Sequence, residues 1–524
     1  MSRSLARLPV DVISEFQLQE CAIRRPWLTR TCFFLNGALL MLSFAPAGLY
    51  PLALILLLPV LFSFYRLAPR SAAELGFAFG AGLFLTGTYW LYVSVHVFGQ
   101  APLFVAIFLM LGLVFIMALY YAATGWLVAR ISAAQPWRFL LVAPAVWVLL
   151  EWLRGWFLSG FPWMTVGYSQ VDSPLAGFAP VLGVFGVSLL LVISAAAIVA
   201  SLFVAGKARM ALIAVAVLPW VTGAGIRPVE WTDSAGRTVR TTIVQGGVSQ
   251  DRKWLPEQFR STLELYRNSL LNHGDSALVI WPEVAIPAVL DQVESFVSIL
   301  QSDVASSDTM LMFGILERDA AREKVYNSVV AIDGNRRQVY RKRHLVPFGE
   351  YFPVPGFVRE WMRMMNLPYS DISAGDDRQP LLEMPDGNQL SVAICYEDAY
   401  AAEQLYALPD AGILINVSND AWFGDSIAPH QHLQIARMRA LEAGRYVVRA
   451  TNNGISAFIA PDGSLLETGP QFEYLAMTYD VVPYAGLTPY AWGGNWPVVT
   501  SCSLVLAVAG WRIRRQRKQI QLSN

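Results

Sequence analysis

Long apolar runs fill most of the first half of the chain and make it a membrane protein. Between about residue 28 and residue 225 the sequence is nearly all apolar. One crossing of a bilayer takes about 20 apolar residues in a helix. Only 15% of the residues are charged, whereas soluble domains carry about 25%. We therefore expect about eight spans, some shorter than ideal: Trp27–Phe44, Tyr50–Tyr65, Leu75–Phe98, Pro102–Val128, Phe139–Leu158, Phe178–Val204, Met210–Gly225 and Trp496–Trp511.

Basic residues in the short connecting loops predict how the chain is oriented. Lys and Arg collect on the cytoplasmic side of membrane proteins. The loops after the first and third runs contain neither residue. The loops after the second, fourth and sixth runs carry Arg66 and Arg70, Arg130 and Arg138, and Lys207 and Arg209. This alternation predicts a cytoplasmic N-terminus, a polar domain outside the cytoplasm and a basic C-terminal tail inside it.

The polar stretch before the last run predicts an α/β domain. Short β-rich runs alternate there with helix-like segments such as Glu257–Leu271 and Gln431–Ala443, as in α/β folds. We divide the chain into residues 1–226, a cytoplasmic tail and seven transmembrane helices; residues 227–488, a catalytic domain; and residues 489–524, the last transmembrane helix and a basic tail. The expected strands are Thr241–Val244, Ala277–Ile280, Thr309–Phe313, Ser328–Ile332, Ser391–Ile394 and Gly412–Val417.

The composition excludes two classes of site in the polar domain. Basic and acidic residues number 39 each, so a formal net charge of zero gives no general attraction for nucleic acid. Cys395 is the single cysteine of this part, because Cys21, Cys32 and Cys502 lie in or beside apolar runs. A disulfide framework and a cysteine-rich zinc site are therefore excluded there.

Two charged residues stand near the end of the fifth run. Glu151 and Arg154 are three positions apart and so share one helix face. Charges at membrane depth are costly and usually pair or face a cavity. We expect either a structural pair or a site for a lipid headgroup.

Three reactive side chains stand at or near the ends of expected strands. They are Glu283, Lys342 and Cys395. In α/β sheets, ligands tend to meet the carboxyl ends of strands. Glu283 would take the proton of the Cys395 thiol as general base. Lys342 would lower the pKa of the thiol and, with a backbone N–H, stabilise an oxyanion, so that an acyl-thioester forms on the cysteine.

Each of these residues also has a structural interpretation. A cysteine at a strand end is often an inert small apolar residue. Glu283 follows Trp-Pro and could cap a helix, and Lys342 lies in a basic run that could be solvated.

The histidines offer alternatives to this scheme. His344 could compete with Glu283 as the base, but Glu283 follows an expected strand, so we expect His344 to orient the loop that bears Lys342. His430 and His432 are two positions apart and have no nearby Cys or His to complete a zinc set, so we expect no metal.

The order Glu283, Lys342, Cys395 resembles the nitrilase superfamily, whose fold is an αββα sandwich. Apolipoprotein N-acyltransferases, the membrane-embedded variant, are more similar still, with several spans, a nitrilase-like periplasmic domain and one last span. The resemblance covers essentially the whole chain. The segments that carry it are His344–Tyr351 (HLVPFGEY), Cys395–Glu397 (CYE), Asn416–Gly424 (NVSNDAWFG), Pro429–His432 (PHQH) and the following Arg437, Arg439 and Glu442.

The resemblance implies roles for particular residues. Glu283, Lys342 and Cys395 would be a catalytic triad that needs no metal or organic cofactor. The other residues implied are Glu350 and Glu397, holding Lys342 and the thiol region in place, and Tyr396 and Trp254, lining or shaping the substrate site.

The resemblance also implies substrates and location. The acyl donor would be a phospholipid, with phosphatidylethanolamine favoured, and the acceptor the α-amino group of a diacylglyceryl-cysteine lipoprotein. The chain would lie in a bacterial inner membrane with its catalytic domain in the periplasm. Two other functions stay open: a membrane-tethered nitrilase or amidase acting on small amides, and a non-catalytic membrane scaffold or transporter.

The segment Tyr351–Leu367 is unusually apolar for a water-facing domain. We expect it either to form a lid that dips into the membrane interface and contacts lipid through Phe352 and Trp361, or to pack on the core of its own domain.

Overall fold

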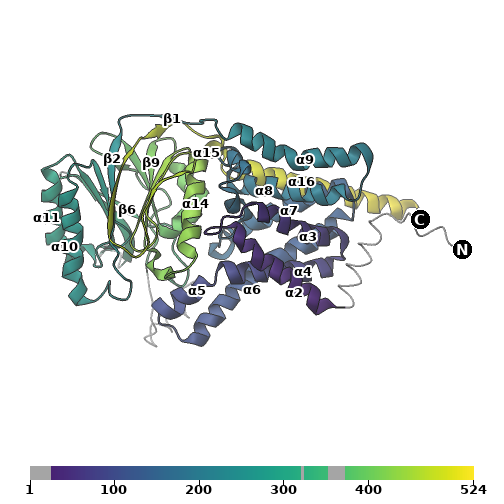
Figure 1. Ribbon diagram of the computed structural model, residues 1–524, viewed down its shortest axis with the longest axis horizontal. Helices are drawn as coiled ribbons and strands as arrows, with labels where there is room; N and C mark the ends of the chain where they lie inside the picture. The colour runs from purple at the N-terminus through teal and green to yellow at the C-terminus, as the bar shows by residue number, and fades with distance from the viewer. Residues whose placement is uncertain (1–24, 320, 322–323, 335, 352–371, 524) are drawn as a thin grey trace. The chain divides into compact units, whose positions relative to one another are not determined.

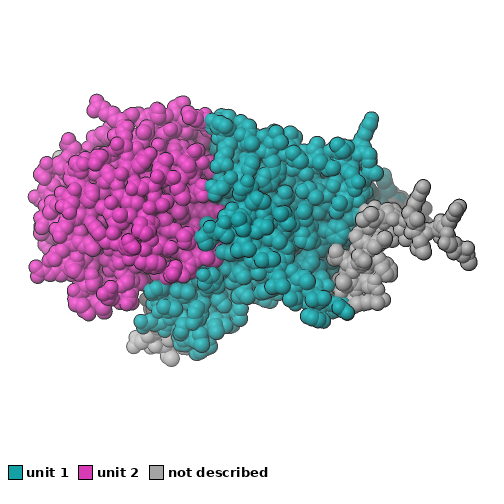
Figure 2. All heavy atoms as spheres, viewed as in Figure 1, with its two compact units in different colours: residues 1–229, 493–524 teal, residues 230–492 magenta. Residues whose placement is uncertain are grey.

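The computed structural model describes residues 25–319, 321, 324–334, 336–351 and 372–523. The chain forms two compact units (Figure 2). One unit is helical and contains residues 1–229 and 493–524, and the other is an α/β unit of residues 230–492.

Each of the eight apolar runs forms a helix in the helical unit (Figure 1). The third run begins earlier than expected, at Pro69, and continues after a bend of 50° as Trp90–Phe98. The C-terminal helix packs against α7 and so closes the same bundle. The helices are α2 (Pro26–Leu40), α3 (Pro51–Arg66), α4 (Pro69–Gly87), α5 (Trp90–Tyr92), α6 (Leu103–Ser132), α7 (Pro136–Arg154), α8 (Ala179–Ser201), α9 (Gly206–Ile226) and α16 (Trp496–Ser523).

Among the described residues, five helices are long and apolar enough to cross a membrane, or six if the bent pair is one span. The α2 and α3 helices are shorter, with 15 and 16 residues, so the expected eight spans reduce to five or six by length and composition. The α8 helix is mostly buried, whereas α6 and α9 expose most of their apolar surface, as lipid-facing helices do.

Glu151 and Arg154 are buried at the end of α7 and hold the segment that follows it. Arg154 donates hydrogen bonds to the carbonyl oxygens of Phe161 and Trp163, and Glu151 Oε1 accepts one from the N–H of Val166 at 3.0 Å. Each charge therefore holds the backbone of the segment that follows α7, and the two do not form the ion pair with each other that was one of the two expectations.

The α/β unit is built on two six-stranded sheets, with strand orders β13-β2-β3-β4-β5-β6 and β12-β11-β10-β9-β8-β7. All six expected strands are present. The bounds in the first sheet are Val239–Gln245 (β2), Leu278–Ile280 (β3), Met310–Asp319 (β4), Lys324–Ile332 (β5), Arg337–Arg341 (β6) and Leu475–Val481 (β13). Those in the second are Leu382–Glu383 (β7), Gln389–Ile394 (β8), Ala411–Ser418 (β9), Tyr446–Thr451 (β10), Ala457–Ile459 (β11) and Leu465–Thr468 (β12).

The two sheets pack face to face between two layers of helices. Ile243 and Met312 of the first sheet share one buried core with Val392 and Ile415 of the second. The outer face of the first sheet packs against α10 (Pro256–Asn272) and α11 (Glu294–Ala305), and that of the second against α14 (Ala428–Ala443) (Figure 1). The result is the expected αββα sandwich.

Strand direction places the carboxyl ends of several strands at the same edge of each sheet. The β2, β3 and β4 strands are parallel, and β6 is antiparallel to β5, which is antiparallel to β4, so β3 and β6 point the same way. In the second sheet β8, β9 and β10 are parallel. The segments that follow these strands therefore emerge at the edges where α/β proteins bind ligands.

Candidate active site

Cys395 stands at the turn where β8 ends and a short 3₁₀ helix, Cys395–Ala399, begins. Its backbone has φ +53°, in the left-handed region that residues with a side chain rarely adopt. Such strain persists where the surrounding structure fixes it, and it is common at functional sites. The thiol is free and partly buried.

Glu283 follows β3 by three residues, and its carboxylate is held by three hydrogen bonds. Its Oε1 accepts from Asn327 Nδ2 at 2.7 Å and from Lys342 Nζ at 3.3 Å. Its Oε2 accepts from the N–H of Asn419, just past β9, at 2.8 Å. The side chain is 7% exposed. A carboxylate with about four acceptor positions keeps capacity for one more proton.

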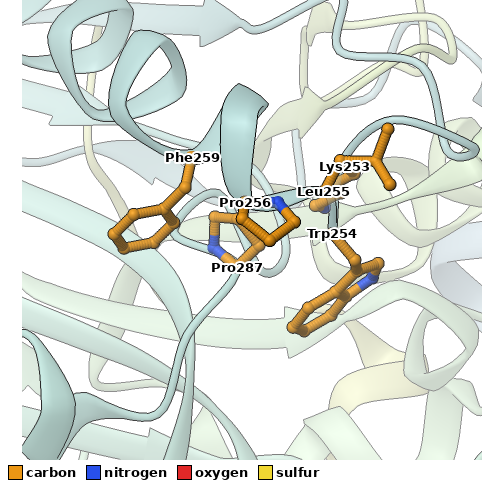
Figure 3. A pocket seen from close by; sticks show the side chains of 6 residues that line it. All are labelled: Lys253, Trp254, Leu255, Pro256, Phe259 and Pro287. Atoms are coloured by element: carbon orange, nitrogen blue, oxygen red, sulfur yellow. The ribbon is translucent and has the colours of Figure 1, made fainter.

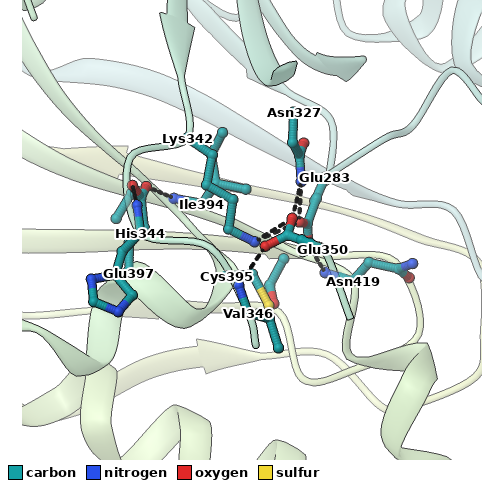
Figure 4. A network of polar contacts seen from close by, with 12 residues as sticks. Glu283, Asn327, Lys342, His344, Val346, Glu350, Ile394, Cys395, Glu397 and Asn419 are labelled. Carbon is teal, nitrogen blue, oxygen red and sulfur yellow. Dashed lines mark hydrogen bonds and ion pairs between the residues drawn. The ribbon is translucent and has the colours of Figure 1, made fainter. Parts of the chain in front are cut away.

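Lys342 directly follows β6 and is fully surrounded, with 1% exposure. Its Nζ donates to Glu350 Oε1 at 2.9 Å as well as to Glu283. Burial would lower the pKa of Lys342, but the charges of Glu283 and Glu350 outweigh it and raise that pKa. The ammonium therefore stays charged, and Figure 4 shows it beside the Cys395 sulfur and the two carboxylates.

Burial and the charge of Glu283 raise the pKa of the Cys395 thiol. Lys342 lowers it, as the sequence analysis expected, but its effect is smaller than that of burial and Glu283. The net shift of the thiol pKa is therefore upward. A protonated thiol beside an ionised carboxylate calls for proton transfer to Glu283 as the sulfur attacks.

Glu397 ties the loop that bears Lys342 to the turn that bears Cys395. Its buried carboxylate accepts from the N–H groups of Arg343 at 2.7 Å and Ile394 at 2.7 Å, and from Tyr340 Oη at 3.0 Å. Burial raises the pKa of Glu397, although Arg343 and these hydrogen bonds oppose the shift.

Next to Cys395, a buried network of hydrogen bonds and an ion pair joins residues that were not predicted as part of the site. His432 on α14 places Nε2 3.1 Å from the carbonyl oxygen of Cys395 and Nδ1 3.0 Å from Asp420 Oδ1. Arg449 donates to Asp420 Oδ2 at 2.7 Å. Burial would raise the pKa of Asp420, but Arg449 and His432 outweigh it and lower that pKa. Asp420 and His432 lie within the motifs at 416–424 and 429–432, but the sequence does not show that these motifs contact Cys395, because that contact depends on the fold.

Cys395, Asp420 and His432 each bring a potential metal-ligand atom within 4.8 Å of the others. The sequence offers no Cys or His near His432 that could complete a zinc set; in the fold, Cys395 and the carboxylate of Asp420 come close to it. Asp420 and His432 bond to each other and Asp420 also pairs with Arg449. A metal ion would therefore have to displace these contacts.

The structure places the remaining predicted residues as follows. Tyr396 is buried beside Tyr400, with ring centres 5.2 Å apart. His344 stacks on Tyr400 at 3.6 Å, and its Nδ1 lies 3.0 Å from Glu403 Oε1, which fits the expected loop-orienting role. Phe352, Trp361 and the expected lid lie outside the described residues.

Trp254 is half exposed and lines a cavity of about 250 Å³ (Figure 3). Apolar side chains form most of the wall, and the one cation is Lys253, whose Nζ donates to the carbonyl oxygen of Glu283 at 3.3 Å. The cavity thus adjoins the turn of Glu283. The other lining residues are Leu255, Pro256, Phe259 and Pro287.

The fold and the Glu–Lys–Cys arrangement define a nitrilase-type protein. A family model of the carbon-nitrogen hydrolases matches residues 240–485. A solved structure of a nitrilase-superfamily member from Saccharomyces cerevisiae is 18% identical, covers 47% of this chain and 91% of its own length, and has a TM-score of 0.36.

The comparison with curated proteins reaches a narrower class. Apolipoprotein N-acyltransferases from Methylococcus capsulatus and Nitrosomonas europaea are 41% and 40% identical to this chain. The alignments cover 93% and 91% of this chain, and 96% and 94% of the relatives. A family model of the apolipoprotein N-acyltransferase N-terminal domain also matches residues 36–197. The chain belongs to the apolipoprotein N-acyltransferase family.

Proposed function

We propose that this protein moves a fatty acyl group from a phospholipid, through a thioester on Cys395, to the N-terminal amine of a diacylglyceryl-cysteine lipoprotein. The observation that carries this proposal is the pairing of buried Glu283 and Lys342 with the partly buried Cys395, in a chain that also contains a helical membrane unit. Phosphatidylethanolamine is the favoured donor. Family membership supports the acceptor.

The first half-reaction acylates the enzyme. Cys395 Sγ attacks an ester carbonyl carbon of the donor while its proton passes to Glu283. The oxyanion of the tetrahedral intermediate is stabilised by the Lys342 ammonium, whose raised pKa keeps it charged. The ester C–O bond then breaks, Glu283 returns the proton to the leaving oxygen, and lysophospholipid departs.

The second half-reaction transfers the acyl group. The neutral α-amine of the lipoprotein attacks the thioester carbonyl and gives a proton to Glu283. The C–S bond breaks, an amide remains on the lipoprotein, and Glu283 protonates the departing sulfur of Cys395. Water must be kept out between the two steps, because hydrolysis of the thioester would make the enzyme a phospholipase.

The supporting residues hold the charged groups of Glu283 and Lys342 in position. Asn327 Nδ2 and Lys342 Nζ each donate to both Glu283 Oε1 and Glu350 Oε1, so the four side chains fix each other. Glu397 holds the two backbone segments together. Tyr396 and Trp254 are the described candidates for contact with substrate. We place residues 227–488 in the periplasm, and residues 1–226 and 489–524 in and beside a bacterial inner membrane.

Intact-protein mass spectrometry after incubation with phosphatidylethanolamine tests the scheme. We expect the mass of one fatty acyl group on Cys395, removed by neutral hydroxylamine and absent from Cys395→Ala. Transfer of that group to a diacylated lipopeptide completes the test. Folded native protein that acquires no adduct would refute the covalent scheme.

Two rival functions give different results in the same preparation. A membrane-tethered amidase would hydrolyse a small water-soluble amide without lipid. A non-catalytic scaffold would keep its function in Cys395→Ala. The buried Lys342, with two carboxylate partners, favours the acyltransferase over a scaffold, because burying three charges is costly unless they serve the site.

A further inference from the structure

The turn that carries Glu283 has an unfavourable backbone. Val284, the next residue, has φ +46°, which is strained for a β-branched side chain. Such a conformation persists only where its surroundings impose it. The direction of the Glu283 carboxylate therefore depends on groups that hold this turn.

One of these groups is the strand on which the turn lies. Gly314 of β4 approaches the turn so closely that a Cβ there would lie 2.7 Å from Glu283 Cα and 2.4 Å from Val284 N. The N–H of Gly314 also donates to the carbonyl oxygen of Pro282 at 3.2 Å. The β4 strand thus fixes one side of the turn but not the Glu283 carbonyl group.

Lys253 holds that carbonyl from the other side. Its side chain is 2% exposed, and its Nζ donates to Glu283 O at 3.3 Å. Burial lowers the pKa of Lys253 to about 8, although the Glu283 carboxylate opposes the shift. Burying an ammonium disfavours its charged form, and groups with such shifted pKa values cluster at functional sites.

The segment that supplies Lys253 is itself attached to the site. The side chain of Asn452 pairs with both backbone groups of Val248, and its Nδ2 also reaches Asn419 Oδ1 at 3.2 Å. Asn419 Nδ2 donates to Gln250 Oε1 at 2.9 Å. Because the N–H of Asn419 also binds Glu283, the carboxylate and the carbonyl of Glu283 are both held by one connected network.

We propose that Lys253 is a positioning residue for the acyl transfer: its ammonium fixes the Glu283 main chain, and with it the aim of the carboxylate at the Cys395 thiol. This inference rests on the proposed function, in which Glu283 is the base. Lys253 acts through Glu283 and touches no reacting atom.

Among the described residues, the segments around Lys253 carry few other charges. The turn of residues 281–287 contributes Glu283, whose carboxylate is bonded to Lys342. The first turn of α10 contributes Glu257, and the segment of Lys253 itself contributes Asp251 and Arg252, all three of them exposed. Burial raises the pKa of Cys395, and carboxylates raise that of Lys342, so neither of these groups titrates near pH 8.

The test is the rate of the first half-reaction in single turnover, measured with the full chain in mixed micelles of phosphatidylethanolamine. The acyl adduct on Cys395 and the released lysophospholipid are followed from pH 6 to pH 10. The variants are Lys253→Met and Lys253→Arg, with Lys324→Met as a matched control, because Lys324 is exposed at the start of β5. Omitting the lipoprotein acceptor removes the titration of its amine.

We expect Lys253→Met to slow acylation about tenfold to a hundredfold, as an error of about 1 Å in a catalytic group does. The donor concentration that gives the half-maximal rate should stay unchanged. The native rate should fall above pH about 8 as the ammonium is lost. That fall should be absent in Lys253→Met and displaced upward in Lys253→Arg, which should keep most of the native rate because a guanidinium stays charged up to about pH 12.

A native rate in Lys253→Met would overturn the inference. So would a slow Lys253→Met that keeps the alkaline fall, or a Lys253→Arg no faster than the methionine variant, because both results indicate packing alone. Should Lys253→Met fail to fold, an unshifted alkaline fall in Lys253→Arg would overturn it equally. Absence of any adduct in folded native protein would instead refute the proposed function.

Discussion

Replacing Gly314 with alanine should slow catalysis strongly in a protein that still folds. In the native structure, an added Cβ would lie 2.4 Å from Val284 N, 2.5 Å from Pro282 O and 2.7 Å from Glu283 Cα. Ordinary contacts of a Cβ begin at 3.4 Å, so the shortest of these distances is about 1 Å too short. All three obstructing atoms are main-chain atoms of the Glu283 turn, and no flexible side chain can move aside.

The size of the effect follows from that 1 Å. The turn has to lift away from β4 by a comparable distance and carry the Glu283 carboxylate with it. A misplacement of about 1 Å at a catalytic group costs about 10²-fold in rate. Overpacking of a buried site costs about 1–3 kcal/mol in stability. We therefore expect Gly314→Ala to fold but to acylate Cys395 about a hundredfold more slowly.

The assay is the single-turnover formation of the acyl adduct at saturating donor, with thermal unfolding measured on the same preparation. Gly274→Ala is the control, because the nearest atom to an added Cβ there is Leu271 O at 4.0 Å. The control should match native protein in both measurements. Acylation at the native rate by Gly314→Ala would show that the turn tolerates the shift. It would refute the argument that contact between the turn and β4 determines the position of the Glu283 carboxylate.

Three further perturbations test other parts of the site. Glu350→Gln removes one of the two carboxylates bonded to Lys342, so acylation should slow about tenfold or more with little change in donor affinity; a native rate would contradict this. Asp420→Asn removes the carboxylate that binds Arg449 at 2.7 Å and leaves it only the more distant Asp398, at 4.0 Å. The free energy of unfolding should therefore fall by about 1.5–3 kcal/mol, and an unchanged denaturation midpoint would contradict the network. Alkylation of Cys395 by iodoacetamide should still accelerate up to pH 9.5, because the raised pKa leaves little thiolate at lower pH, whereas a plateau near pH 8 would contradict it.

The hydrophobic patterning predicted the architecture well. Every apolar run became a helix, and all six expected strands formed, because buried runs of β-branched and aliphatic residues leave little choice of structure. The strands Tyr446–Thr451 and Arg337–Arg341 were missed: the first contains a buried arginine and the second has an arginine at each end. Their strand state is set by pairing with β9 and β5, which the local sequence does not encode.

The sequence singles out the reactive residues of the candidate site but not the residues that support them. Glu283, Lys342 and Cys395 stand out because each follows a strand within a distinctive motif. Asn327 and Asn452 are unremarkable polar residues in the sequence, and the hydrogen bonds to Glu283 and Val248 appear only once distant strands are placed. The upward shift of the Cys395 pKa could not be predicted from the sequence either, because it depends on how deeply the folded chain buries the sulfur.

The reactive residues of the site are divided between the two sheets, so the site forms only when the sheets pack together. Glu283 and Lys342 follow strands of one sheet, and Cys395 follows a strand of the other, more than fifty residues later in the chain. Neither sheet alone carries both a nucleophile and a base. The thiol, the carboxylate and the ammonium therefore come together only after the two sheets have packed, so the reactivity of the site depends on the completed fold of the whole α/β unit.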